Sequence, residues 1–162
     1  TSRSRGLGDV YKRQATILYV TQDQAEATTL ADKIGVLKEG HLVQIGTPEE
    51  IYENPNSIYV SQRLGSPKIN ILPGTLLGMN DVPTFGIRPE NITIGNGNHS
   101  AKIISIENLG SETVVALNFK DQEILVSIQG NYKSSINETI NFDINNEKVL
   151  RFNKEGNRIY ER

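Results

Sequence analysis

Residues 16–55 constrain the fold most, because they predict secondary-structure elements in a fixed order. Residues 17–20 form a short apolar run, which predicts a strand. A helix is expected directly after it, because Thr21 can cap a helix and Gln24, three residues on, can complete a capping box. Apolar side chains then recur at the spacing of one helical face, namely Ala27, Leu30, Ala31 and Ile34.

A hairpin and a second helix complete this stretch. Residues 34–37 and 42–45 predict two short strands joined by a glycine-containing turn. Thr47 can cap the helix that follows, Pro48 suits its first turn, and Glu50 completes a second capping box.

The pattern changes after a third helical stretch, predicted at residues 57–64 with Gly65 as its C-terminal cap. A linker is expected near residues 65–70, and short β segments separated by turn signals follow it. The expected strands are residues 70–77, 84–87, 101–108, 112–119, 123–128, 139–145 and 148–153. Several short strands at this spacing predict a small barrel or sandwich.

Composition narrows the classes of function. Hydrophobic residues make up 36% of the chain, and no apolar run approaches the roughly 20 residues that span a bilayer. The chain has no cysteine, and His41 and His99 lie far apart in sequence, so no metal site is predicted. Residues 1–14 hold four basic residues and one acidic residue, which leaves 13 of the 17 basic and 18 of the 19 acidic side chains for the remainder. This acidic remainder argues against a nucleic-acid-binding surface.

Residues 1–14 read TSRSRGLGDVYKRQ and have neither helical nor strand periodicity. We interpret them as a non-native, adapter-like segment and exclude them from fold reasoning. The alternative is a basic arm for nucleic acid or membrane.

Ordered motifs connect the chain to a known family. Residues 20–27 read VTQDQAEA, residues 65–70 read GSPKIN and residues 86–92 read GIRPENI. In this order and spacing they resemble the C-terminal part of ABC transporter ATP-binding subunits, in particular the sugar-importer family of the maltose and sn-glycerol-3-phosphate type. The resemblance implies an α+β chain. In it, the C-terminal remnant of an α/β P-loop ATPase domain at residues 15–66 precedes a small all-β, OB-like TOBE barrel at residues 67–162. In that family the strand at residues 17–20 is an inner member of a larger sheet, so the resemblance implies a truncated fragment whose first strand lacks its neighbours. Residues 15–65 are then expected to be poorly stable alone, to dimerise or to aggregate.

Most of the residues that hydrolyse ATP in that family are absent from this sequence. ATP hydrolysis needs a loop such as G-x-x-x-x-G-K-[ST] for the phosphates, a carboxylate for Mg²⁺ and a group that positions water. The chain has no such loop, no Asp-Glu pair and no L-S-G-G-Q signature. By resemblance, the intact protein uses ATP and Mg²⁺. The chain alone is expected to bind neither tightly and to be inactive.

One nucleotide-contacting position of the family remains, and it is altered. Gln22 stands where the family has the switch-loop histidine, which contacts the γ-phosphate and helps to orient the attacking water. Gln22 is therefore the predicted catalytic and cofactor-binding position. Its amide can donate and accept hydrogen bonds but cannot carry a proton or become cationic. Three interpretations stay open: a degenerate ATPase, a tolerated substitution and a sequence error.

Other polar residues have structural explanations. Asp23 and Glu26 lie in the first turns of a predicted helix, where the helix dipole favours carboxylates. His41 is expected to lie exposed beside the hairpin turn. The Arg88-Pro89-Glu90 motif is interpreted as a structural turn at a contact between domains.

The resemblance implies a subunit that powers an ABC importer for carbohydrate uptake. Such a subunit is expected to form a homodimer, to engage membrane permease subunits from the cytoplasmic face of the cell membrane, and to receive a regulatory protein at its C-terminal domain. The alternative function is a non-catalytic regulatory or small-ligand-binding module built on the OB-like domain. Nucleic-acid binding is not expected, because the strands offer few aromatic side chains amid acidic surroundings.

Overall fold

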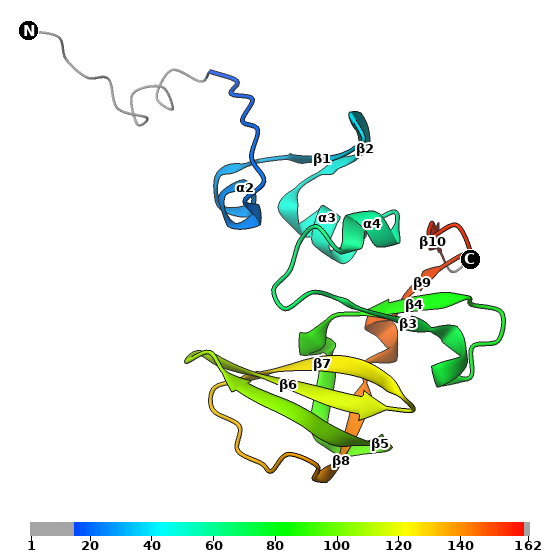
Figure 1. Cartoon of the computed structure of the whole chain (residues 1–162). Coiled ribbons are helices and arrows are strands. Elements are labelled where there is room, and N and C mark those ends of the chain that lie inside the picture. Colours follow the sequence, from blue (N-terminus) through cyan, green and yellow to red (C-terminus); the bar gives the residue numbers. More distant parts are fainter. Residues whose placement is uncertain (1–14, 161–162) are drawn as a thin grey trace, which may run out of the picture.

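The computed structural model describes residues 15–160, so the adapter-like segment predicted at residues 1–14 lies outside the described residues. The first part holds short helices and one hairpin: α2 (Gln24–Leu30), β1 (Ile34–Lys38), β2 (His41–Gly46), α3 (Pro48–Glu53) and α4 (Ile58–Ser61). The second part consists of strands and short 3₁₀ turns (Figure 1): β3 (Asn70–Pro73), η1 (Gly74–Leu77), β4 (Thr84–Ile87), η2 (Pro89–Asn91), β5 (Ile92–Asn108), β6 (Glu112–Phe119), β7 (Gln122–Gln129), β8 (Thr139–Ile144), η3 (Asn146–Lys148), β9 (Leu150–Phe152) and β10 (Arg158–Ile159). In the described chain, the α-helices are thus confined to the first part.

The strand predicted at residues 17–20 is wrong for the described chain, where this segment is extended but unpaired. Its side chains are exposed, with Leu18 93% accessible. A strand needs a neighbour to satisfy its backbone N–H and C=O groups, and none of the strands between residues 15 and 160 lies beside it. The apolar face predicted for the next helix is likewise uncovered: α2 has no buried residue and Leu30 is 64% exposed.

The hairpin and α3 confirm the local predictions. β1 pairs with β2 in antiparallel register, and His41 lies exposed beside the turn, as expected. At the start of α3, Thr47 Oγ1 accepts a hydrogen bond from Glu50 N at 3.1 Å, and Glu50 Oε2 accepts one from Thr47 N at 2.8 Å. A small core beneath these elements consists of Val36, Ile51, Val60 and Leu64.

The third helix is shorter than predicted. α4 ends at Ser61 and its C-cap is Gln62, so Gly65 is not the cap. Leu64 leaves the helical path to join the small core, and Gly65 adopts a φ of +109° in the segment that leads to β3.

The second part contains two antiparallel four-stranded sheets, in the orders β10-β9-β4-β3 and β7-β6-β5-β8. The predicted strands are all present, although residues 74–77 form the 3₁₀ turn η1 instead of extending β3. The largest correction is β5, which begins at Ile92 and has 17 residues. The first half of β5 was not predicted, because the glycine and asparagine residues at 95–98 are typical of a turn. In the structure they form an irregularity in the pairing of β5 with β8. A Cβ at Gly97 would lie 2.0 Å from Phe142 O, so only glycine fits there.

One core lies between the two sheets and unites them. Its fully buried side chains include Phe85 and Ile87 from one sheet and Val115, Val126 and Phe142 from the other. In place of the expected closed OB-like barrel, the described strands form two sheets around a shared core. Backbone pairing among the described strands does not join them into one closed sheet.

Asn70 connects the two sheets where their edges approach. Its Oδ1 accepts from Leu125 N at 2.7 Å, and its Nδ2 donates to Leu125 O at 2.8 Å and to Ile87 O at 3.3 Å. Asn70 is on edge strand β3 and Leu125 on edge strand β7. A buried side-chain amide therefore stands in for part of a strand ladder between them.

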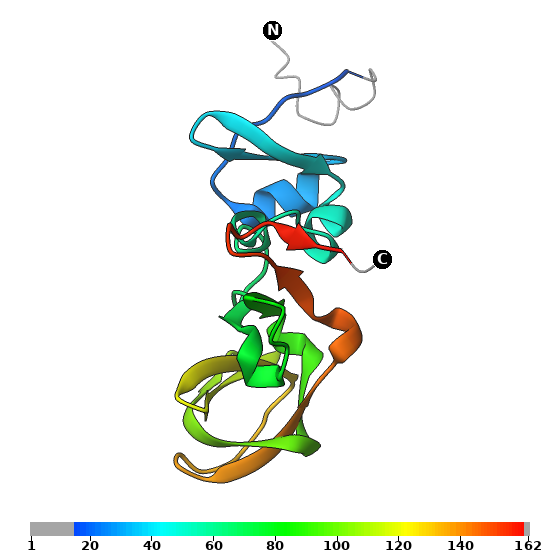
Figure 2. The same cartoon turned by 90° about the vertical axis from the view of Figure 1, so that its right-hand side faces the viewer.

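The C-terminal strands return to the first part of the chain (Figure 2). Arg158 N donates to Asn56 O and Ile58 N donates to Gly156 O, each at 2.9 Å. Ile58 also packs on a small cluster that contains Phe152. No helix between residues 15 and 160 has the length and apolar character needed to cross a bilayer.

Candidate functional site

The segment that carries Gln22 is held by hydrogen bonds on both sides of it. Thr21 Oγ1 accepts from Asp23 N at 3.0 Å and donates to Glu26 Oε2 at 2.8 Å. Tyr19 Oη also donates to Glu26 Oε2, at 3.2 Å. The Glu26 charge raises the pKa of the Tyr19 hydroxyl, because a negative neighbour disfavours tyrosinate. Gln22 itself is exposed, and its side chain has no hydrogen-bond partner among residues 15–160.

The capping box predicted between Thr21 and Gln24 is wrong. Asp23 is the N-cap of α2, and its Oδ1 accepts from Ala25 N at 2.8 Å and from Glu26 N at 3.2 Å. Asp23 is thus structural, as predicted. The amide of Gln24 is turned away from the helix start, because it bonds to a distant segment.

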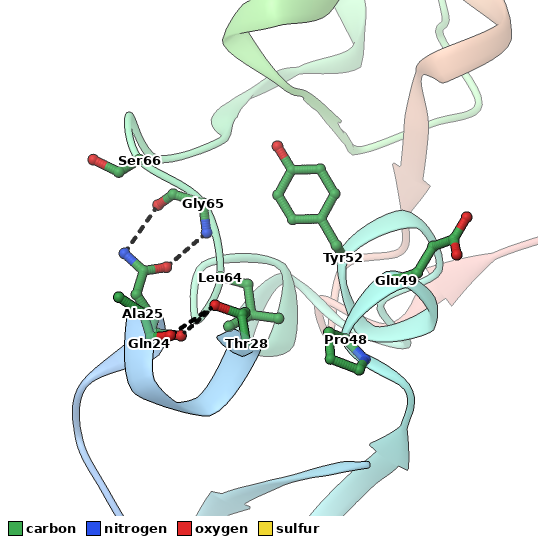
Figure 3. Close-up of a pocket in the computed structure, with 9 residues that line it drawn as sticks. All are labelled: Gln24, Ala25, Thr28, Pro48, Glu49, Tyr52, Leu64, Gly65 and Ser66. Carbon is green, nitrogen blue, oxygen red and sulfur yellow. Dashed lines mark hydrogen bonds between the residues drawn. The ribbon is translucent and has the colours of Figure 1, made fainter. Parts of the chain in front are cut away.

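Gln24 contacts the backbone of Gly65 through both atoms of its amide (Figure 3). Its Oε1 accepts from Gly65 N at 2.8 Å, and its Nε2 donates to Gly65 O at 3.5 Å. This contact ties the first turn of α2 to the segment that precedes β3. It lies two residues from Gln22, so it restrains the position of the segment that carries Gln22.

Arg88 fixes the same segment from the other side. Its Nη1 donates to Ser61 O at 3.0 Å and to Leu64 O at 2.7 Å, and its Nη2 donates to Tyr52 O at 2.9 Å. The guanidinium carbon lies 3.9 Å from the centroid of the Tyr52 ring. Arg88 is only 4% exposed. The interpretation of the Arg88-Pro89-Glu90 motif as a structural contact is confirmed by these bonds.

Tyr52 and Glu90 complete the network. Tyr52 Oη donates a hydrogen bond to Glu90 Oε1. Burial raises the pKa of Tyr52, and the hydrogen bond to Glu90 raises it further. Burial also lowers the pKa of Arg88. The Gln24–Gly65 contact, the Arg88 bonds to Leu64 and Tyr52 and the Tyr52–Glu90 bond thus join the Gln22 segment to the β-sheet part of the chain.

A hollow of about 480 Å³ lies beside this network, between α2, α3 and the residues before β3 (Figure 3). Its wall is mostly apolar and includes Ala25, Pro48, Tyr52 and Leu64. The Gln24 amide faces Gly65 at its edge. Within residues 15–160, no group of three metal-ligating side chains occurs.

The network can hold the segment that carries Gln22. The group that this segment exposes to solvent is the neutral amide of Gln22. Sequence reasoning anticipated the structural roles of Asp23 and of the Arg88 motif, whereas the assignment of Gln22 stays a prediction. It missed the Gln24–Gly65 contact and the role of Tyr52. The one local sequence feature that could have indicated the Gln24–Gly65 contact is the glycine at position 65, directly before Ser66 and Pro67.

Comparison with known proteins covers both parts of the chain. Residues 85–152 match the family model of the TOBE domain. An uncharacterized ABC transporter ATP-binding protein, y4oS, of Sinorhizobium fredii is 36% identical over 70% of this chain and 37% of that protein. The chain contains a TOBE domain and is a homologue of ABC importer ATP-binding proteins. The sn-glycerol-3-phosphate import ATP-binding protein UgpC of Psychromonas ingrahamii is 33% identical over 90% of this chain and 46% of that protein.

A third relative is named for alpha-glucoside transport. The alpha-glucoside transport ATP-binding protein AglK of Rhizobium meliloti is 29% identical over 87% of this chain and 47% of that protein. The chain therefore spans less than half the length of these curated relatives.

Proposed function

We propose that the chain is the C-terminal part of an ATP-binding subunit that powers an ABC importer for carbohydrate uptake. The observation that carries this proposal is the match to import ATP-binding proteins over as much as 90% of the chain. Residues 15–66 would be the end of the ATPase domain and residues 67–162 the TOBE domain. The separate small core under α3 and the larger core between the sheets support this division.

In this proposal Gln22 occupies the switch-loop position and faces nucleotide bound by residues outside this chain. Its exposure fits that role, and the Gln24–Gly65 contact would keep the loop in place between turnovers. A neutral amide can orient water but cannot stabilise the developing charge on the transferred phosphate as a cationic imidazole does. We therefore expect slowed hydrolysis with near-normal ATP binding.

The complete protein would bind ATP and Mg²⁺, form a homodimer and drive membrane permease subunits from the cytoplasmic side of the membrane. The TOBE part would support dimer contacts and receive a regulatory protein. The 162-residue chain alone is expected to be inactive, because no phosphate-binding loop occurs in its sequence.

The deciding experiment begins with resequencing of the genomic locus across codon 22 and several hundred bases upstream. The expected result is an open frame that continues through a phosphate-binding loop and a signature motif. A verified start codon close to Ala15 would contradict the proposal and favour the non-catalytic regulatory module.

The longer protein is then purified in two forms that differ at one residue. If the locus encodes glutamine, Gln22→His should raise MgATP turnover by about a hundredfold or more, the size of effect expected of one group that stabilises charge in the transition state. ATP affinity should change little. Equal turnover of the two forms would refute the catalytic role assigned to residue 22.

A further inference from the structure

The peptide group between Leu64 and Gly65 is hydrogen-bonded at both ends, to side chains from the two parts of the chain. Its carbonyl oxygen, on Leu64, accepts from Arg88 Nη1 at 2.7 Å. Its N–H, on Gly65, donates to Gln24 Oε1 at 2.8 Å (Figure 3). A peptide group is planar and stiff, so a displacement of its oxygen also displaces its N–H. Arg88 in the TOBE part and Gln24 in α2 are therefore connected through one rigid unit.

The position of this peptide group is set from the side of Arg88. The same Nη1 atom also donates to Ser61 O at 3.0 Å. Gly65 has a φ of +109°, and a Cβ at this position would lie 3.0 Å from Arg88 Nη1 and 3.2 Å from Tyr52 Cε2. The backbone is thus packed closely against both side chains. A shift of the Arg88 guanidinium cannot leave the Gly65 N–H in place.

Helix α2 has few other restraints. It has no buried residue, and the hollow of about 480 Å³ lies between its Ala25 and Thr28 and the residues of α3. Within residues 15–160, the hydrogen bonds of α2 that reach beyond residue 31 both go to Gly65, one from each atom of the Gln24 amide. Gln24 is exposed. A solvent-exposed hydrogen bond contributes little net stability, so this connection can open and close in the folded chain.

We propose that Gln24 is a positioning residue, which makes the Gln22 segment follow the TOBE part through the Leu64–Gly65 peptide group. Gln22 moves with α2, because Thr21 Oγ1 is bonded to Glu26 Oε2 and Asp23 caps the helix. A partner that binds the TOBE part and displaces Arg88 thereby changes the fraction of molecules in which the Gln24–Gly65 bond is formed. The meaning of this movement for ATP hydrolysis rests on the proposed function, whereas the connection itself does not.

Distances between two spin labels test the connection in the 162-residue chain without nucleotide. The chain has no cysteine, so Gln22→Cys and His41→Cys provide two defined labelling sites, one beside α2 and one on the hairpin. Pulsed electron paramagnetic resonance should show one main distance between them. Gln24→Leu should reduce the population at this distance about fivefold relative to other distances, because it removes the bond to Gly65. Gln24→Glu should restore the population, because it keeps an acceptor oxygen for Gly65 N.

A second label pair is the control for local unfolding. His41→Cys and Glu49→Cys place labels on the hairpin and on α3, which are joined by the small core of Val36 and Ile51. Gln24→Leu should leave this distance unchanged. Equal distance distributions with Gln24 and with Gln24→Leu in the first pair, or equal broadening in both pairs, would overturn the proposal.

Control by the TOBE part is tested with Arg88→Lys, which keeps the charge but removes the forked donor. It should reduce the main population of the first pair when Gln24 is present and have no further effect in a chain that carries Gln24→Leu. The same effect in both backgrounds, or in neither, would overturn this control. If Arg88→Lys lacks a folded circular dichroism spectrum, Gly65→Ala takes its place, because its Cβ would displace the peptide group from Arg88 Nη1.

The longer protein connects this movement to catalysis. Gln24→Leu should lower kcat for MgATP about fivefold with an unchanged KM, and Gln24→Glu should restore kcat. Unchanged kcat in Gln24→Leu would refute the positioning role and leave the ATPase proposal intact. An unsubstituted longer protein without ATPase activity would refute the proposed function, while the spin-label distances would still decide whether the connection exists.

Discussion

Replacement of Arg88 by glutamine measures how strongly the TOBE part is held to the helices before it. Arg88 makes three hydrogen bonds to backbone carbonyls and stacks on Tyr52. At about 1 kcal/mol each, the three bonds give about 3 kcal/mol. The stacking contact adds about 1 kcal/mol. Arg88→Gln should therefore lower the free energy of unfolding by about 4 kcal/mol, because a shorter, neutral side chain cannot span these carbonyls.

Arg63 provides a matched control in the same chain. Its guanidinium carbon lies 4.0 Å from the Tyr59 ring centroid, nearly the stacking distance of Arg88, but its side chain is exposed. Arg63→Gln should lower the free energy of unfolding by about 1 kcal/mol or less. The assay is equilibrium urea unfolding followed by far-ultraviolet circular dichroism, with m-values compared between variants. If Arg88→Gln is no more destabilising than Arg63→Gln, the assignment of Arg88 as the structural connection is refuted.

The contacts of Gly65, Tyr52 and Asn70 give three further expectations. Gly65→Ala should lower the free energy of unfolding by about 2 kcal/mol, because φ is +109° and the new Cβ would lie 3.0 Å from Arg88 Nη1. The control is Gly110→Ala, at φ +92° with no atom near the new Cβ, which should lower the free energy of unfolding by about 1 kcal/mol. Equal losses for the two variants in thermal unfolding would exclude a steric contribution at Gly65. The folded-state pKa of Tyr52 is raised above the ordinary value of 10.0, so its contribution to stability is complete below that pH and is lost as pH rises above it. Tyr52→Phe should flatten this alkaline loss in unfolding measured across pH, and an unchanged profile would contradict the assignment. Asn70→Leu should cost about 2 kcal/mol in urea unfolding, since it leaves Leu125 N and two carbonyls without their partner; a neutral effect would show that the sheets do not need this amide.

The elements that were predictable are those whose signals are local. The capping box of Thr47 and Glu50 fixed the start of α3, and strand alternation located β6 at its observed bounds. Residues 17–20 failed because a strand requires a neighbour, and an apolar run cannot show whether one is present. The first half of β5 was missed because its glycine-rich residues normally indicate a turn, whereas here they form a bulge against Phe142.

The site was predictable only as far as a motif reached. Gln22 could be proposed as a site residue because the residues around it resemble the switch-loop motif, and that assignment stays a prediction. The bond from Gln24 to Gly65 crosses 41 residues, and no local pattern reports such a distance.

The return of β10 to the residues around α4 has a consequence for the order in which the protein can mature. A ribosome releases the chain from its amino end, and early segments begin to fold as they emerge. Ile58 cannot meet Gly156 until nearly a hundred further residues have been made. The helix α4 therefore lacks this packing partner until β10 has been made, and its apolar surface stays open to chaperones or to other nascent chains. The strand β10 thus completes the packing of a helix that is synthesised much earlier in the chain.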